Sequence, residues 1–185
     1  PLAEDLSVLG EPVEIGDLVA PNRLIVHHME GCDGSAAGAP ATLTVRRYER
    51  WAAGGAGLLW FEATAVVREA RANPRQILLI RENLHGFKAM LDRTLEIARE
   101  THGDGFRPVT VLQLTHSGRY SRPVDKPAPI LGHHDGVLDK VQNISPDHPL
   151  VTDEELDDLV GAYVRAARLA REAGFDAIDL KHCHR

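Results

Sequence analysis

Long apolar runs and blocks of like charge are both missing from this sequence of 185 residues. No stretch of about 18 consecutive apolar residues occurs, so we expect no membrane span. Lysine and arginine form no cluster and the formal net charge is −6, so nucleic acid and anionic membrane surfaces are not expected partners. The opening residues, Pro1 to Asp5, lack the basic start and apolar stretch of a signal peptide.

Cysteine is also scarce, because only Cys32 and Cys183 are present and they lie far apart in the sequence. Without a signal peptide, we expect free thiols in a reducing compartment, and therefore a cytoplasmic location. The rest of the composition, 43% hydrophobic and 26% charged, is that of a globular protein. A chain of this length can bury a sizeable core if the fold that it encodes is complete.

Strand-like and helix-like segments alternate after a short opening hairpin. The hairpin is expected over residues 12–19, with its turn at Gly16 and Asp17. Apolar segments then predict strands near residues 24–29, 58–64, 109–115 and 176–181. Helices are expected over residues 43–53, 84–98 and 152–174.

The third helix has the clearest signals of the three. Thr152 and Glu155 have the spacing of a capping box, and Gly174 stands where a left-handed residue ends a helix. The residues expected to line its apolar face are Leu156, Leu159, Val160, Tyr163, Ala167 and Ala170.

The alternation of strands and helices predicts an α/β fold with a parallel sheet. Each strand is apolar until its carboxyl end, where polar groups appear. This pattern indicates buried strands with chemistry at one rim, as in a barrel, although a doubly wound open sheet would show the same alternation. The long connections over residues 66–83 and 117–149 are of the kind that builds active-site walls.

Four segments resemble the Old Yellow Enzyme and 2,4-dienoyl-CoA reductase family of NADH:flavin oxidoreductases. They are residues 22–31, 54–66, 112–119 (Leu-Gln-Leu-Thr-His-Ser-Gly-Arg) and 173–184, which begins Ala-Gly-Phe-Asp. All four occur in the family's order and at barrel-like separations. The resemblance implies the N-terminal half of a (β/α)8 TIM barrel, preceded by the short β-hairpin, with residues 1–185 forming a single incomplete FMN-binding domain.

The resemblance also implies roles for particular residues. FMN would lie across the strand ends, against main-chain groups near Met29 and Glu30 and at Ala63, with the Gln113 amide along its pyrimidine edge. NAD(P)H would reduce the flavin, and the flavin would pass a hydride to an activated alkene or related small molecule.

Two positions implied by the resemblance concern the substrate, whose carbonyl oxygen would be held from Lys181 and His184. The family has a histidine at the first of these positions. Because a lysine is a mobile point charge rather than a planar donor, its presence favours an anionic ligand or a reaction other than alkene reduction.

Other parts of the family's machinery would lie beyond Arg185, including the proton-donating tyrosine, the phosphate site and any iron–sulfur cluster. We therefore expect this exact chain to be inactive and to bind FMN poorly. A half barrel also leaves open strand edges, so a homo-oligomer is an alternative.

Two other interpretations stay open. In the first, the chain is a metal-dependent barrel hydrolase that uses its His-rich strand ends, although no metal site with about four ligands is evident. In the second, it is a non-catalytic half barrel that self-associates. Arg119, just past a strand end, is as suited to a structural salt bridge as to a ligand contact. The arginines from Arg68 to Arg81 are expected in a solvated loop.

Overall fold

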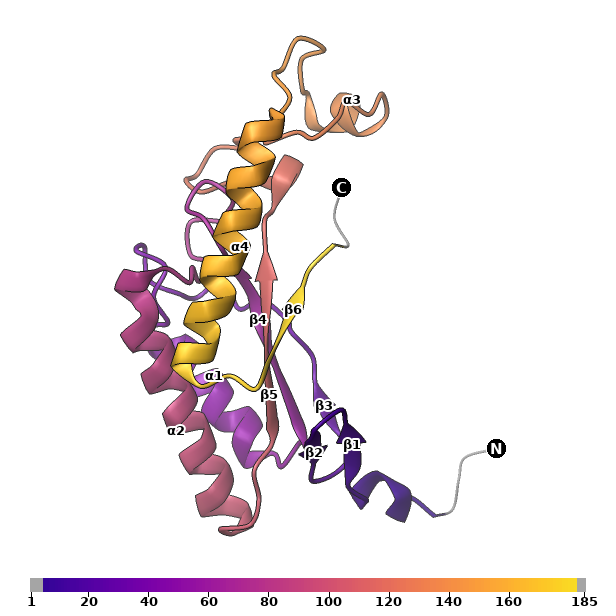
Figure 1. The fold of residues 1–185 in the computed structure, drawn as a ribbon, viewed down its shortest axis with the longest axis vertical. Helices are drawn as coiled ribbons and strands as arrows, with labels where there is room; N and C mark the ends of the chain where they lie inside the picture. The colour runs from indigo at the N-terminus through magenta and orange to yellow at the C-terminus, as the bar shows by residue number, and fades with distance from the viewer. Residues whose placement is uncertain (1–4, 183–185) are drawn as a thin grey trace.

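Four parallel strands form the main sheet of the protein, which a computed structural model describes over residues 5–182 (Figure 1). They are β3 (Ile25–Val26), β4 (Leu58–Ala65), β5 (Val109–Thr115) and β6 (Ala177–Leu180). The spatial order β3-β4-β5-β6 is also the order in the chain. Successive strands are therefore joined by crossovers, as in the first half of a (β/α)8 barrel.

The register of the sheet brings the carboxyl ends of β4, β5 and β6 to one level, because Ala65 pairs with Thr115 and Leu114 with Leu180, whereas β3 ends opposite Leu59 near the start of β4. Val26 pairs with Leu59, Phe61 with Leu112, and Gln113 with Asp179. The β4–β5 register shifts between Phe61 and Thr64, so Glu62 and Ala63 lie in a bulge. Bulges re-aim side chains and are common beside active sites.

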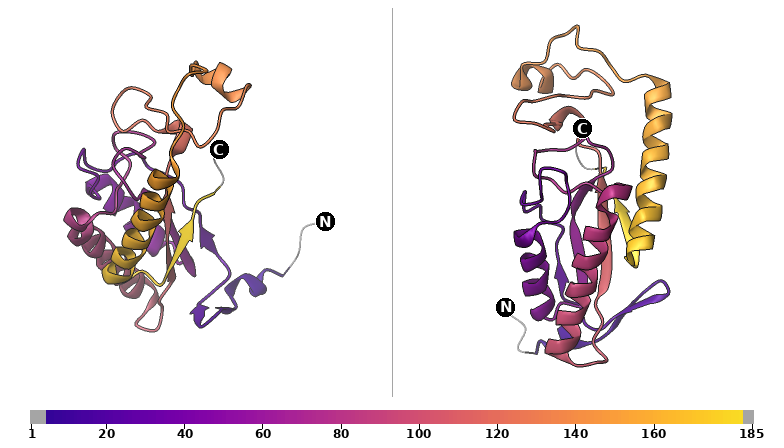
Figure 2. Two further views of the ribbon diagram at one scale, coloured as in Figure 1. Left: turned by 45° about the horizontal axis from the view of Figure 1, so that its top comes forward. Right: turned by 90° about the vertical axis from the view of Figure 1, so that its left-hand side faces the viewer.

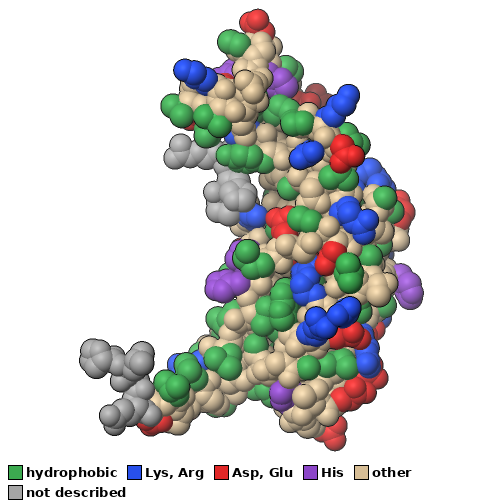
Figure 3. Space-filling model, turned by 180° about the vertical axis from the view of Figure 1, so that it is seen from behind, with side chains coloured by type: hydrophobic (Ala, Val, Ile, Leu, Met, Phe, Trp, Pro, Cys, Tyr) green, Lys and Arg blue, Asp and Glu red, His purple; other side chains and the backbone are tan. Residues whose placement is uncertain are grey.

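Three long helices lie on one face of this sheet (Figure 2). They are α1 (Thr42–Ala53), α2 (Leu84–His102) and α4 (Asp153–Ala173). Between them and the strands is the main core, in which Tyr48 stacks on Phe61 with ring centroids 4.1 Å apart. Burying each such side chain stabilises the fold by roughly 1.5–3 kcal/mol. On the side away from the helices the molecule is hollowed, as Figure 3 shows from behind.

The opening hairpin consists of β1 (Val13–Ile15) and β2 (Leu18–Ala20), which pair antiparallel. Its turn contains Gly16 at φ +61°, a conformation that glycine adopts without strain. Ala20 packs against Leu58 and Val109, so the hairpin covers the amino-terminal ends of β4 and β5.

Short helices complete the structure. Three are 3-10 helices, η1 (Ser7–Gly10), η2 (Arg81–Asn83) and η3 (Gly118–Tyr120), and the fourth is α3 (Leu138–Gln142) in the long connection before α4. No helix within residues 5–182 is long and apolar enough to cross a membrane.

The strand expected at residues 24–29 is shorter than predicted, because β3 ends at Val26. The chain turns there, with the Met29 N–H donating to the His27 carbonyl at 2.8 Å. The Gly31 N–H then donates to the Glu62 carboxylate at 3.0 Å rather than to a neighbouring strand. The Glu62 side chain thus takes the place of a neighbouring strand as hydrogen-bond acceptor. The apolar pattern of the sequence does not predict such a contact.

The capping box of α4 is confirmed, whereas its predicted apolar face is partly wrong. Thr152 and Glu155 bond reciprocally, and Gly174 ends the helix at φ +107°. Leu156 and Val160, however, are 45% and 63% exposed. The helix instead buries a face of mostly small residues, which allow it to lie close to the sheet: Ala162, Ala166, Leu169, Ala170 and Ala173.

Candidate functional site

The predicted site residues within the described chain come together at the carboxyl rim of the sheet. Met29 and Glu30 follow β3, Ala63 lies in the β4 bulge, Gln113 is in β5, and Lys181 directly follows β6. Lys181, after β6, and Glu30, after β3, form an ion pair with 3.5 Å between Nζ and Oε1. This contact joins the segments that follow the two edge strands of the sheet. His184 lies outside the described residues.

Gln113 presents an unsatisfied acceptor at this rim. Its Nε2 donates to Asp179 Oδ2 at 2.6 Å. Its Oε1 is buried and has no hydrogen-bond partner within residues 5–182. Leaving a buried acceptor unsatisfied costs about 1–3 kcal/mol, so this oxygen is suited to accept an N–H from a ligand.

A second polar group lies deeper on the same side. The His28 and Trp60 rings have centroids 4.8 Å apart, and His28 Nδ1 and Trp60 Nε1 are buried with no hydrogen-bond partner in the described part of the chain. Burial lowers the pKa of His28, opposed by the charge of Asp179. The imidazole is therefore neutral near pH 7 and keeps one donor and one acceptor.

The Glu30–Lys181 ion pair is mostly buried, with side chains 23% and 12% exposed. Burial raises the pKa of Glu30, and the charge of Lys181 opposes that rise. The Lys181 ammonium therefore already has a carboxylate partner, and any anionic ligand would compete with Glu30 for it.

Sequence reasoning missed a buried charge network beneath the rim. Glu62, 1% exposed, accepts from Arg47 Nη2 at 2.8 Å, and the same nitrogen donates to Asp33 Oδ1 at 2.8 Å. The available signal was a lone carboxylate inside the apolar run of β4 (Leu-Leu-Trp-Phe-Glu-Ala-Thr-Ala), since a buried charge needs a partner.

The loop after β4 is also fixed by buried polar side chains. Gln76 Nε2 donates to the Ala63 carbonyl at 3.0 Å. Arg71, only 3% exposed, donates to the Gln76 and Ala36 carbonyls at 2.9 and 3.0 Å. The expectation of solvated arginines is therefore wrong for Arg71, which joins the two loops that follow β3 and β4.

Arg119 is paired with a carboxylate, which supports its structural interpretation, and it also lines a cavity beside α4, so a ligand contact stays open. Its side chain is 2% exposed, and Nη1 lies 2.6 Å from Asp139 Oδ1. Nη2 donates to the His133 carbonyl at 3.1 Å. These bonds hold the connection between β5 and α4 in place.

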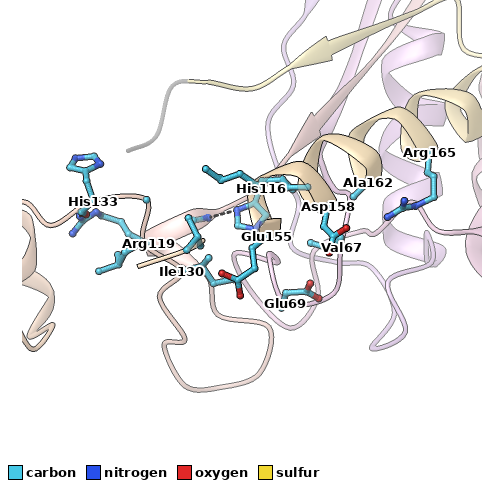
Figure 4. Close-up of a pocket in the computed structure, with 16 residues that line it drawn as sticks. Val67, Glu69, His116, Arg119, Ile130, His133, Glu155, Asp158, Ala162 and Arg165 are labelled. Carbon is cyan, nitrogen blue, oxygen red and sulfur yellow. Dashed lines mark hydrogen bonds between the residues drawn. The ribbon is translucent and has the colours of Figure 1, made fainter. Parts of the chain in front are cut away.

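A cavity of about 640 Å³ lies between the end of β5, this connection and the first half of α4 (Figure 4). His116 lines it and accepts the Gly118 N–H on Nδ1 at 3.1 Å, and burial lowers the pKa of that imidazole. Glu155 and Asp158 come from α4. None of the predicted site residues within the described chain lines this cavity, although it lies just past the carboxyl ends of β4 and β5, which Val67 and His116 follow.

No group of three or more histidine, cysteine, aspartate or glutamate residues within 5–182 is arranged to hold a metal ion. Cys183 and His184, which the hydrolase alternative also uses, lie outside the described residues.

Helices on one face of a parallel sheet whose strands follow one another in chain order define the class as a (β/α)8 barrel, represented by its first four strands. The chain belongs to the NADH:flavin oxidoreductase / NADH oxidase family, whose profile matches residues 8–184. The resemblance seen in the sequence is thus confirmed.

Comparisons with individual proteins agree. An NADPH dehydrogenase from Listeria monocytogenes serotype 4b is 30% identical over 186 residues, covering 97% of this chain and 49% of the relative. Morphinone reductase superposes with a TM-score of 0.71 at 24% identity, over 93% of this chain and 47% of that one. The Old Yellow Enzyme from Pichia sp. AKU4542 gives a TM-score of 0.72 at 17% identity, over 94% and 45%. The two structures establish the fold alone, and the chain spans about half the length of these proteins.

Proposed function

We propose that this chain is the front half of an FMN-dependent oxidoreductase that passes a hydride from NAD(P)H, through the flavin, to an activated alkene or a related small molecule. Residues 1–185 then form a single incomplete FMN-binding domain. The proposal is carried by the convergence of Met29, Glu30, Ala63, Gln113 and Lys181 on one rim. Family membership supports it, since the family's own description names a flavin and NADH.

The residues at the rim fit a flavin. Gln113 Oε1, which has no partner within residues 5–182, would accept a pyrimidine N–H, while main-chain groups near Met29 and Glu30 and at Ala63 would border the ring. The Ala63 carbonyl already accepts from Gln76, which fixes its direction. When bound, FMN supplies the hydride-transfer chemistry, and the protein supplies orientation and electrostatics.

Lys181 and His184 would hold the substrate oxygen. A cation aimed at that oxygen stabilises negative charge that develops as the hydride arrives. Lys181 is held by Glu30 at 3.5 Å, so a substrate must either accept a bond from the ammonium beside that carboxylate or displace the carboxylate. Displacement favours a substrate with an oxygen of substantial negative charge, whereas a retained carboxylate would repel one and favours a neutral carbonyl.

The proposal is tested on the complete protein that carries this chain. Purified protein should show stoichiometric flavin absorbance and should oxidise NAD(P)H when an activated alkene is supplied. Gln113→Leu should weaken FMN binding by about tenfold, because one to two hydrogen bonds are lost. Gln142→Leu, in α3 and away from the rim, is the matched control and should bind FMN normally. A colourless parent protein with no affinity for added FMN contradicts the proposal.

We also propose that the 185-residue chain alone is inactive and binds FMN poorly. In this chain, only the four strands of the main sheet would border the flavin. The edge strands β3 and β6 each have one strand neighbour within residues 5–182. Open edges with apolar surface promote pairing between molecules, which supports a homo-oligomer of the isolated chain. The free thiol of Cys32 supports a cytoplasmic location.

A further inference from the structure

One buried carboxylate joins two backbone segments of the rim. Glu62 Oε2 accepts the Gly31 N–H at 3.0 Å, in the loop that follows β3. The main-chain N–H of Glu62 itself donates to the Tyr48 hydroxyl at 2.8 Å, at the bulge that presents Ala63. The same Tyr48 hydroxyl donates to Glu62 Oε1 at 3.3 Å. The Glu62 carboxylate therefore bonds both the 29–31 loop and the hydroxyl that holds the bulge.

Arg47 completes this connection from α1. Nη2 donates to both Glu62 Oε1 and Asp33 Oδ1 at 2.8 Å, and Nη1 donates to the Met29 carbonyl at 3.4 Å. The guanidinium carbon lies 5.2 Å from the Trp51 ring centroid and 5.3 Å from that of Tyr48. A planar guanidinium bonds several oxygens while stacked on aromatic rings, which a lysine ammonium does not reproduce.

The network is mostly buried and leaves little space around it. Burial raises the pKa of Glu62, but Arg47 and the Gly31 N–H oppose the rise. Burial disfavours the charged form of Arg47 and acts to lower its pKa. The ion pairs with Glu62 and Asp33 outweigh burial and hold the pKa of Arg47 above its usual value. A Cβ at Gly31 would overlap the Arg47 guanidinium, so the loop lies directly on that group.

We propose that Glu62 and Arg47 are positioning residues, which set the backbone geometry of Met29, Glu30 and Ala63 for the flavin without touching it. This inference rests on the proposed function. Glu62 is 1% exposed and all of its described bonds run to protein groups, so its influence on a ligand passes through the backbone. Groups that hold contact residues in place typically must fix them within about 0.5 Å.

The test uses Arg47→Lys in the complete protein, with Arg93→Lys as the matched control. Arg93 lies on α2, is 41% exposed and pairs with Glu49 and Glu96. Arg47→Lys should weaken FMN binding by about tenfold, since the bond to the Met29 carbonyl and one carboxylate bond are lost. The visible spectrum and the reduction potential of the remaining bound flavin should also shift. Arg93→Lys should change none of these.

A merely structural role would alter the thermal midpoint of the FMN-free protein and leave the spectrum, the potential and the FMN affinity of the folded variant unchanged, and that result overturns the inference. If Arg47→Lys does not fold, Asp33→Asn decides by the same measurements. Asp33 is partly exposed, and its substitution removes only one charged partner of the Arg47 guanidinium. If the parent protein itself binds no FMN, the proposed function fails and this inference fails with it. Normal binding by the parent and by both variants overturns this inference alone.

Discussion

At the scale of single residues, buried polar groups determine what the rim presents. In the described part of the chain, Gln113 keeps an oxygen there without a partner, Lys181 is paired with Glu30, and Glu62 bonds the loop after β3. The same principle operates away from the rim at Arg119, whose guanidinium is paired with Asp139. The Arg119–Asp139 pair leads to a prediction about stability at acidic pH.

The Asp139 carboxylate should contribute to stability only above strongly acidic pH. The Arg119 bond, with help from His134, lowers the pKa of Asp139 from 3.8 to about 2. Because the folded-state pKa is the lower one, the stabilisation is complete above the unfolded value and is lost as pH falls from about 4 to about 2. Asp139→Asn should flatten the decline of the thermal midpoint across that range, whereas Asp104→Asn in an exposed loop should not. Parallel declines in Asp139→Asn and the parent would contradict the assignment.

How far the sequence predicts the site differs from residue to residue. Glu30, Gln113 and Lys181 follow from the resemblance to the flavin oxidoreductase family, and a parallel sheet brings the carboxyl ends of their strands to one edge. Arg47 and Asp33 do not follow, because they lie 15 and 29 positions from Glu62 and are joined to it only by the packing of α1 against the sheet. Arg71 gives no sequence signal that separates it from the exposed arginines near it.

At the scale of elements, neighbouring residues in the sequence predict where a helix begins and ends better than they predict which of its faces is buried. The α4 boundaries follow from Thr152 and Gly174, whose roles depend only on neighbouring residues. The buried face of α4 depends on what packs against it, and the close approach of α2 and β5 selects the alanine face rather than Leu156 and Val160. The β4 bulge likewise depends on the distant Tyr48 hydroxyl.

The cap of α4 gives a prediction at this scale. Thr152→Ala removes the hydroxyl that accepts the Glu155 N–H at 3.2 Å, and should lower the free energy of unfolding by about 1 kcal/mol. Thr101→Ala, at an exposed position in the last turn of α2, is the matched control and should have a much smaller effect. Urea unfolding of the complete protein measures both. Equal unfolding midpoints for Thr152→Ala and the parent would show that the cap adds nothing.

At the scale of the whole molecule, the four-stranded sheet leaves apolar surface beside β6. Ile178 and Leu180 of that strand are 38% and 46% exposed, and Val160 and Val164 of α4 are 63% and 46% exposed. Isolated apolar side chains are common on surfaces, but a group beside an open strand edge promotes association.

The isolated 185-residue chain should therefore form oligomers. Sedimentation at increasing protein concentration should show a rising average mass, with substoichiometric flavin absorbance after incubation with FMN. Val160→Lys with Val164→Lys should shift the equilibrium toward monomer, because two ammonium groups would have to be desolvated. Val141→Lys, at a residue that is 73% exposed in α3, serves as the control. A monomeric parent chain that retains one FMN per molecule would refute both the association and the poor binding.

The agreement between strand order in space and strand order in the chain bears on how the protein is made. β4 pairs with β3, β5 with β4, and β6 with β5, so every ladder needs only residues that have already left the ribosome. Each of these strands therefore finds its partner already synthesised, and no ladder of the main sheet within residues 5–182 has to wait for a distant segment of the chain.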